Sequence, residues 1–587
     1  MTTADLSKNP FEYDAAGNLD VQDLLDVFVE DYNYSRFICA QRNVFLIGER
    51  GSGKSMTLRF NEFRSKRAND ERNKQSVNYD HLGVLVECKT PLYARRNDSF
   101  EGVEELKSQL ISEHLLVTEI GQALATSLAS CQSELEPTEN DAVLKSLELF
   151  FDTALTDYSK NLFEAIKLYF KKLNLDAQRD MNTFQWEKDD KEYVTFSSVI
   201  LPLLEELRNI KVFKNSHFMI MIDDAQNLNT YQQHILNSWI SYRNQTIFSF
   251  KIGCAKSEYS DFSTAHNAPI LEGHDYIVLD MEQPFQNATS DFGLFAREVV
   301  SKRLAKVGFD PNDNRLIDEF FPESAAVKSA IQTCTDKVVL EYKDNNAGSS
   351  DKQARDWGYK YGRVSYFRDR HPKANLPSYS GFDTISHLST GVIRSLLKPC
   401  YYMYDAALSQ NSGQPVQNIP ADIQSDILKR ESDKLWIQVK DLHRTVTDCT
   451  EEDAKAIHHL LDCLGSYFLD RLMHHKSEPR ILTFVISGRT ESEINILEPL
   501  FKICRAAGLL YVRRGVSRDK GKREEFYTPN RMLWPSKGLD PIGQHGRASI
   551  PAIDLVAATK GKKIPLIIQG TIENTQQELG LFSEGEQ

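Results

Sequence analysis

The sequence contains no apolar run long enough to cross a bilayer, so no membrane segment is expected. Its first residues, Met1 to Ser7, carry neither the basic nor the apolar region of a signal peptide. The nine cysteines form no C-x-x-C pair, which argues against a zinc site or a disulfide framework and favours reduced packing residues. Together these absences predict a cytoplasmic protein.

The sequence also lacks histidine spacing suited to a metal, although it has fourteen histidines. The pairs His458-His459 and His474-His475 fall on expected helices, where neighbours point in different directions and chelate poorly. No segment shows an internal repeat. We therefore expect these histidine pairs to lie on solvated helix faces.

Charge and composition are otherwise ordinary for a globular protein, with 26% charged and 41% hydrophobic residues. At 587 residues the chain exceeds a single hydrophobic core, which predicts two to four domains. The net charge of −13 argues against a surface that coats nucleic acid along its whole length. A local basic patch remains compatible with it.

A G-x-x-x-x-G-K-[ST] motif follows the apolar run at residues 43–47 and precedes a helical pattern. In this setting backbone N–H groups surround phosphate oxygens, and the helix dipole adds to the attraction. Lys54 is expected to reach the β- and γ-phosphates, and Ser55 to hold Mg²⁺. The alternative is an accidental glycine-serine turn. The predicted nucleotide-binding residues are Gly48, Glu49, Arg50, Gly51, Ser52, Gly53, Lys54, Ser55 and Met56.

Two acids end a second apolar run, at residues 217–224. A continuous apolar run is typical of a parallel strand buried on both faces, and ligands bind at the carboxyl ends of such strands. Asp223 is the better candidate for the Mg²⁺ shell, and Asp224 is then placed to orient or deprotonate the attacking water. The alternative is a strand followed by an acidic turn.

Further strands are expected at residues 82–88, 247–255 and 276–280, alternating with helical patterns, which predicts a parallel α/β sheet. A helix-rich stretch from about 100 to 210 is interpreted as an insertion into this core. Lys256 or Ser257 would lie beside the γ-phosphate if the strand before them neighbours both motifs. A helical pattern at 18–29 predicts a helix beside the nucleotide site or a packed core helix.

Residues 290–405 are expected to be mostly helical, broken by a flexible loop at 345–350. The segment Trp357 to Arg368 interleaves aromatic and basic residues, which favours either ring packing in a lid or stacking on single-stranded nucleic acid. Residues 411–422 resemble a linker.

Beyond that linker, a helix at 494–507 and strands at 509–515 and 524–528 form a winged-helix pattern with a basic tip. Six of the thirteen residues from Tyr511 to Arg523 are Arg or Lys, although Glu524 and Glu525 flank the tip. The alternative is a solvated hairpin on an interaction module. The predicted DNA contacts are Arg513, Arg514, Arg518, Lys520, Lys522 and Arg523.

Three segments taken together resemble an AAA+ ATPase: Gly48–Ser55, Ile222–Leu228 and Ser389–Arg394. The resemblance spans residues 9–405, with a weaker likeness from 430 to 535. It implies that Arg394 is a second sensor that touches the γ-phosphate, so the implied catalytic set is Lys54, Asp224 and Arg394. The order of parts is similar to origin-recognition-type AAA+ proteins, whereas the Asp-Asp pair is more like STAND signalling or transposition-type helper ATPases. Arg297 and Arg303 are the candidates for an arginine finger.

The expected fold is an α/β parallel P-loop NTPase sheet, AAA+-like, with a helical insertion and lid and a C-terminal winged-helix-like domain. The expected parts are a core at 1–290, a lid at 291–410, a winged-helix-like domain at 423–550 and a tail at 551–587. The expected function is Mg²⁺-dependent ATP hydrolysis that switches binding to double-stranded DNA, to a protein partner or to further copies of the chain. Mobile-element control or defence is one possible setting. The alternatives are a nucleotide-dependent scaffold with little turnover and a P-loop kinase.

Overall fold

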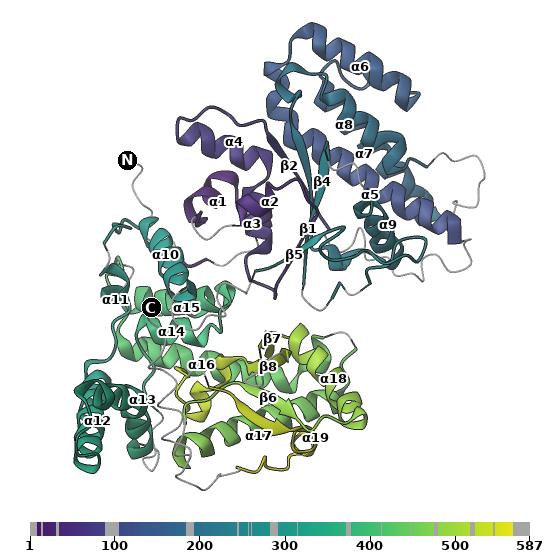
Figure 1. Ribbon diagram of the computed structural model, residues 1–587. Coiled ribbons are helices and arrows are strands. Elements are labelled where there is room, and N and C mark those ends of the chain that lie inside the picture. Colours follow the sequence, from purple (N-terminus) through teal and green to yellow (C-terminus); the bar gives the residue numbers. More distant parts are fainter. Residues whose placement is uncertain are drawn as a thin grey trace. The chain divides into compact units, whose positions relative to one another are not determined.

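The chain forms two compact units (Figure 1). Unit 1 comprises residues 1–317, 391–401 and 413–415, and unit 2 the remainder. The four-part division made from the sequence stays a prediction. The computed structural model describes residues 9–12, 16–30, 34–88, 105–183, 193–242, 246–255, 258–259, 261–281, 291–313, 315–370, 377–411, 414–446, 448–474, 479–516, 523–543 and 546–566.

The centre of unit 1 is a parallel sheet of five strands with the order β2-β3-β4-β1-β5 within the described residues. Each pairing is parallel, and the last residue of β2, Glu87, lies opposite the last residue of β3, Asp223. Because β4 lies between β1 and β3, the strand that leads into the glycine loop and the strand that ends in the acids are separated by one neighbour. The strands are β1 (Val44–Ile47), β2 (His81–Glu87), β3 (His217–Asp223), β4 (Phe248–Cys254) and β5 (Ile277–Asp280).

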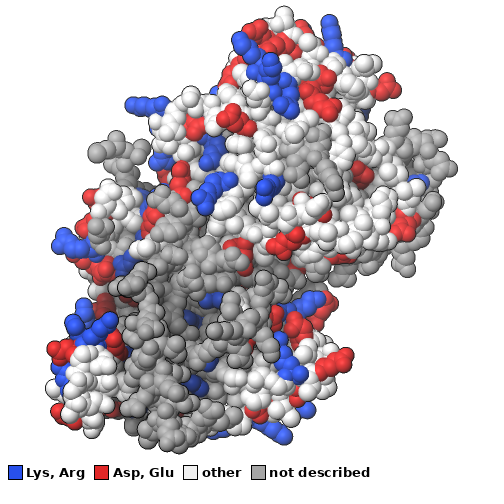
Figure 2. All heavy atoms as spheres, in the orientation of Figure 1, with Lys and Arg blue, Asp and Glu red and all other residues white. Residues whose placement is uncertain are grey.

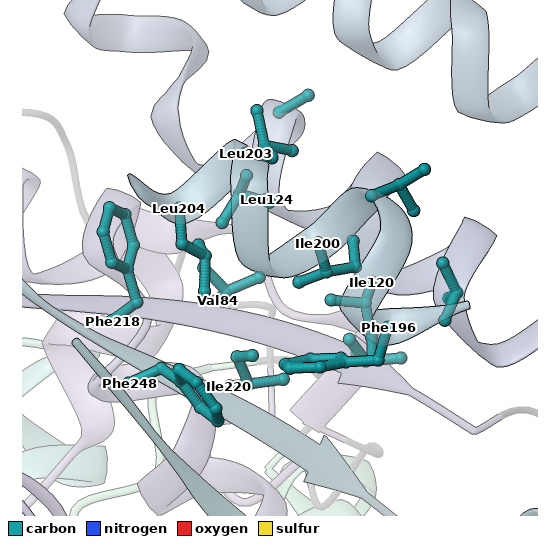
Figure 3. Close-up of a cluster of buried hydrophobic side chains, with 14 of the residues drawn as sticks. Val84, Ile120, Leu124, Phe196, Ile200, Leu203, Leu204, Phe218, Ile220 and Phe248 are labelled. Carbon is teal, nitrogen blue, oxygen red and sulfur yellow. The ribbon is translucent and has the colours of Figure 1, made fainter. Parts of the chain in front are cut away.

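Both faces of this sheet are buried, which explains the continuous apolar run of β3. Phe218 and Ile220 point to one face and pack with Leu203, Leu204 and the inserted helices (Figure 3). Met219 and Met221 point to the other face, against residues of β1 and α3. The α/β core expected from the sequence is confirmed.

Helices cover the two faces of the sheet in unit 1 (Figure 1). The insertion predicted between about 100 and 210 consists, in its described residues, of helices joined by short turns, and the amphipathic segments at 144–151 and 162–170 fall on α6 and α7. The helices are α1 (Val21–Val27), α2 (Ser35–Ile38), α3 (Lys54–Phe60), α4 (Phe63–Arg72), α5 (Glu105–Leu128), α6 (Pro137–Phe151), α7 (Leu162–Thr183), α8 (Leu201–Leu207), α9 (Thr230–Ile240) and α10 (Asp291–Ala305). None of the helices in the described ranges combines the length and apolarity that a bilayer crossing would demand.

The predicted lid is helical, and its aromatic-basic segment lies on α13. Gly358 and Gly362 bring α13 close to α12, and the rings of Tyr342 and Trp357 stack 4.9 Å apart between the two helices. These contacts favour the packing interpretation of that segment. The helices here are α11 (Leu316–Phe320), α12 (Ala325–Asn345), α13 (Asp351–Arg370), α14 (Phe382–Leu388) and α15 (Ile393–Gln410).

The C-terminal part of unit 2 has a mixed sheet of four strands, in the order β7-β8-β6-β9 among the described residues. The predicted hairpin is present as the antiparallel pair β7 and β8, and β6 separates α17 from α18. Residues 552–559, placed in a tail by the sequence, form α19 and pack Leu555 into the core. The elements are α16 (Ala421–Lys440), α17 (Glu451–His474), β6 (Phe484–Ser487), α18 (Glu491–Ala506), β7 (Leu510–Val516), β8 (Arg523–Pro529), β9 (Ala548–Pro551) and α19 (Ala552–Thr559).

Candidate functional site

The glycine loop joins β1 to α3 through backbone conformations that only glycine adopts easily. Gly51 and Gly53 have φ angles of 91° and 102°. A Cβ atom on Gly51 would lie 2.6 Å from the Cβ of Arg394, and the Arg394 N–H donates to the Gly51 carbonyl at 3.3 Å. The loop and the start of α15 are therefore in direct contact.

Lys54 begins α3 and is buried within this loop. Its Nζ donates to the carbonyl oxygens of Gly48 at 2.7 Å and Glu49 at 3.1 Å. Burial lowers the pKa of Lys54, while the nearby Asp223 carboxylate opposes that shift. The hydroxyl of Ser52 is also buried and has no hydrogen-bond partner among the described residues. A phosphate oxygen in the loop would satisfy that donor, so the loop fits a phosphate group.

Asp223 ends β3 with 5% of its surface exposed. Burial raises the pKa of this carboxyl to about 6, Asp224 adds to the shift, and a hydrogen bond with Ser55 opposes it. A hydroxyl and a carboxylate held together are oxygen ligands of the kind that Mg²⁺ prefers. The two metal ligands predicted from the sequence therefore lie side by side.

Asp224 follows in a left-handed conformation, with φ of 55°. Its backbone N–H donates to Asp223 Oδ1 at 3.1 Å, and its own Oδ1 accepts from the amide of Gln226 at 3.0 Å. Asp tolerates this conformation better than most residues. Hydrogen bonds therefore hold both acids at this turn.

One cavity of about 500 Å³ collects these groups. Lys54, Ser55, Asp223, Asp224 and Arg394 all line it. So do Arg50, Gly51, Ser52, Gly53 and Met56, whereas Gly48 and Glu49 contribute through their bonds to Lys54. The volume falls within the range of small-molecule sites.

An apolar wall forms another side of the cavity. It comes from three separate stretches of sequence, namely the segment around α1, α10 and α15. The helix predicted at 18–29 therefore does border the site, through α1 and the residues that follow it. The wall residues are Val27, Phe28, Val29, Tyr34, Phe295, Val299, Ile393 and Leu397.

Several residues of this cavity were not predicted from the sequence, or were predicted to have another role. Gln226 and Glu87 line it but were not singled out, although Gln226 stands in the acidic motif itself. Arg303, a finger candidate, is 8% exposed and lines the cavity of its own chain, and its Nη1 donates to the Glu12 carbonyl at 2.6 Å. Arg297 lies on the same helix, α10, half-buried. Lys256 and Ser257 lie outside the described residues.

The predicted nucleic-acid residues are on or next to the hairpin of β7 and β8. Arg513 and Arg514 lie on β7, opposite Phe526 and Glu525, and Arg523 lies on β8 opposite Val516. Arg518, Lys520 and Lys522 fall outside the described residues.

The two acids that flank the hairpin tip have basic partners. Glu524 pairs with Arg547 at 3.6 Å, and Glu525 pairs with Arg489 at 3.6 Å. These pairs offset the negative charge that the sequence places beside the basic tip. Figure 2 shows positive and negative side chains interspersed over the described residues of the face in view.

The described residues contain no cluster of His, Cys, Asp and Glu arranged to hold a metal ion by themselves. All nine cysteines are free thiols. A metal at the cavity would therefore depend on Ser55, Asp223 and the ligand that it accompanies.

Comparison with known proteins identifies one family. A family model described as ORC-CDC6-like matches residues 9–550. No curated protein matches the chain. The Orc1 protein of Aeropyrum pernix, solved in complex with DNA, is 10% identical with a TM-score of 0.26, over 85% of this chain and 86% of that chain. Cdc6p of Pyrobaculum aerophilum is 12% identical with a TM-score of 0.25, over 94% of this chain and 96% of that chain.

Proposed function

The chain belongs to the ORC-CDC6-like family, and from this premise we propose that it is an AAA+ ATPase whose nucleotide state controls binding to double-stranded DNA. The observation that carries the proposal is the convergence of Lys54, Asp223, Asp224 and Arg394 on one cavity. Asp223 ends β3 and Asp224 follows it, while Lys54 and Arg394 lie at the starts of α3 and α15. Motifs that arose by chance would not be expected to line the same cavity.

Each of these side chains has a role that its position supports. Lys54 holds the β- and γ-phosphates, since its buried ammonium already lies within the loop. Asp224 accepts a proton from the attacking water, and Arg394 contacts the γ-phosphate. Ser55 and Asp223 would hold Mg²⁺, which when bound supplies positive charge against the phosphate oxygens. The buried Ser52 hydroxyl adds a donor to the phosphate site.

DNA binding through the β7/β8 hairpin forms the second half of the proposal. Arg513, Arg514 and Arg523 lie on its two strands, and basic residues dominate the segment between those strands. The ion pairs of Glu524 and Glu525 reduce the acidic character of the hairpin. Arginine and lysine side chains are common phosphate contacts in protein–DNA complexes.

Two other functions would use the same nucleotide site, and experiments can distinguish them from the proposed ATPase. A scaffold that binds ATP without turning it over would use the same loop and Mg²⁺ ligands. Its mark would be tight ATP binding with no release of phosphate, with or without DNA. A P-loop kinase would instead transfer the γ-phosphate to an acceptor, which labelled ATP and candidate acceptors would reveal. Control of mobile elements, defence and self-association remain settings for this activity.

Two isosteric variants test the proposal. Asp224→Asn removes the base, so we expect ATP binding to persist and turnover to fall by roughly 10²-fold or more. Asp223→Asn removes a metal ligand, so Mg²⁺-dependent binding should weaken instead. Calorimetry measures binding, and phosphate release measures turnover. The reverse pattern would exchange the two roles, and a wild-type chain that fails to bind ATP would refute the proposed function.

A further inference from the structure

Gln226 makes two hydrogen bonds inside the cavity through opposite ends of one side-chain amide. Its Nε2 donates to Asp224 Oδ1 at 3.0 Å. Its Oε1 accepts from the backbone N–H of Ala255 at 3.1 Å. Because an amide has distinct donor and acceptor ends, this pair of contacts fixes which end faces Asp224.

These two bonds connect the turn after β3 with the end of β4. Ala255 directly follows β4, which lies hydrogen-bonded between β1 and β3. The sheet thus holds Ala255 in place, and Ala255 holds the amide of Gln226. The side-chain amide of the neighbouring Asn227 donates instead to the Cys88 carbonyl at 2.9 Å, and the Asn227 backbone N–H donates to the Asp224 backbone carbonyl, not to its carboxylate.

The two carboxylate oxygens of Asp224 differ in their hydrogen bonding. Its Oδ1 is held by the amide of Gln226, while no described donor is placed on Oδ2. Asp224 stands in a left-handed turn without a regular helix or strand to orient its side chain. A carboxylate that must accept a proton from a bound water needs a defined direction.

We propose that Gln226 is the positioning residue of the hydrolysis reaction: it holds Oδ1 of Asp224 against the end of β4, so that Oδ2 faces the attacking water. The inference rests on the proposed ATPase function. In the step, the water oxygen bonds to the γ-phosphorus, the bond to the bridging oxygen of ADP breaks, and the water proton passes to Asp224 Oδ2. In this role Gln226 acts through Asp224 and not on the phosphate directly.

Gln226→Met tests the role, because methionine has a similar length and no amide. We expect kcat to fall by about tenfold, less than the loss of a base itself, with KM and the Kd for ATP unchanged. Gln226→Glu keeps the acceptor for Ala255 but cannot donate to Asp224, so its kcat should fall at least as far. Gln332→Met on α12 is the matched control, since the Gln332 amide also donates to an aspartate, Asp336, at 2.8 Å, outside the cavity. It should leave turnover unchanged.

A double-mutant cycle separates positioning from loss of structure. In the Asp224→Asn background, Gln226→Met should add no further loss of turnover, because the group through which it acts is already removed. Additive losses, or full kcat in either Gln226 variant, would overturn the inference while leaving an active wild-type ATPase. A wild-type chain that binds ATP but releases no phosphate would instead refute the proposed function on which the inference rests.

Discussion

Burial acts in opposite directions on the two main charges of the cavity. It lowers the pKa of Lys54 and raises that of Asp223, because both ionised forms lose water. The attraction between these two charges offsets part of each shift. A phosphate beside Lys54 and a cation beside Asp223 would supply the rest of the compensation, so the cavity favours the binding of both together.

The first prediction concerns Lys54. Lys54→Ala should weaken ATP binding by roughly 2–5 kcal/mol, the usual result when one member of a buried charge pair is truncated. Calorimetry with a non-hydrolysable ATP analogue measures this loss. Lys145→Ala on the exposed side of α6 is the control and should bind normally. Unchanged affinity in the Lys54 variant would contradict its assignment to the phosphates.

The second prediction concerns pH and Asp223. With a pKa near 6 in the metal-free protein, this carboxyl is ionised above pH 6 and protonated below it. Mg²⁺ must displace that proton, so its binding should weaken by roughly tenfold per unit as the pH falls below 6. Groups that face the carboxyl are Lys54, Ser55 and Asp224, all of which line the same cavity.

A Mg²⁺ titration in the presence of the ATP analogue, at pH values from 5 to 8, checks this dependence. Asp223→Asn should bind Mg²⁺ weakly throughout and lose the steep part of the curve. A wild-type curve that stays flat between pH 5 and 6 would show that another group carries the metal.

At the scale of elements, α12 and α13 form a hairpin with a narrow seam. No residue of α12 is buried, so its packing depends on the close approach that Gly358 and Gly362 permit. A Cβ atom on Gly362 would lie 2.1 Å from the Thr335 hydroxyl and 3.0 Å from its Cα. The backbone of Thr335 cannot turn aside as a flexible side chain can, so a larger residue at position 362 would push the two helices apart.

The third prediction follows from that seam. Gly362→Ala should weaken the packing of α12 on α13 by roughly 1–3 kcal/mol, as overpacking does. Faster hydrogen exchange of α12 amides measures the effect. Gly293→Ala on α10 is the control, because a Cβ there meets no atom within 4 Å and alanine favours helix. Equal exchange in the Gly362 variant and the wild type would show that the helices separate easily.

At the scale of the whole molecule, the net charge of −13 and a basic hairpin are compatible. Charges farther apart than about 8 Å are largely screened at physiological ionic strength, so a distant acidic surface hardly affects phosphates at the hairpin. Glu524 and Glu525, the acids that follow the tip in the sequence, already have arginine partners. Local composition therefore matters more for DNA binding than the overall charge.

The fourth prediction is a salt dependence. Each phosphate that the chain neutralises releases counterions, so the logarithm of the affinity for duplex DNA should fall with the logarithm of salt, with a slope of roughly −0.9 per contact. Replacing Arg518, Lys520, Lys522 and Arg523 by Ser should flatten this slope and leave ATP binding intact. Fluorescence anisotropy measures both proteins across a salt series.

A variant with the same loss of charge controls for that experiment. In this variant four exposed lysines on or near α12 are replaced by Ser, namely Lys328, Lys337, Lys343 and Lys352. The salt dependence of its DNA affinity should have the same slope as that of the wild type. If the wild-type chain fails to bind DNA even at low salt, the hairpin serves a protein interface, and the scaffold becomes the better function.

The sequence by itself determined the parts of the site whose residues are neighbours along the chain. The glycine loop, Lys54 and Ser55 form one motif. Asp223 ends a continuous apolar run, and that apolar composition predicts a buried strand. Backbone preferences and the apolar pattern act over a few residues, so a motif, a strand or a helix such as α18 can be inferred locally. For the same reason the short strands β6 and β9 and the helix α19, which depend on their neighbours, were not predicted.

Only the tertiary structure decided which distant residues share the cavity. Phe28, Phe295 and Leu397 form one wall, Arg394 touches Gly51, and Arg303 lies inside its own chain's cavity. The partners of Gln226, two residues before it and 29 residues after it, meet because β3 and β4 are paired. Sheet pairing and burial act between residues without regard to their separation in sequence, and no local pattern records where such contacts will form.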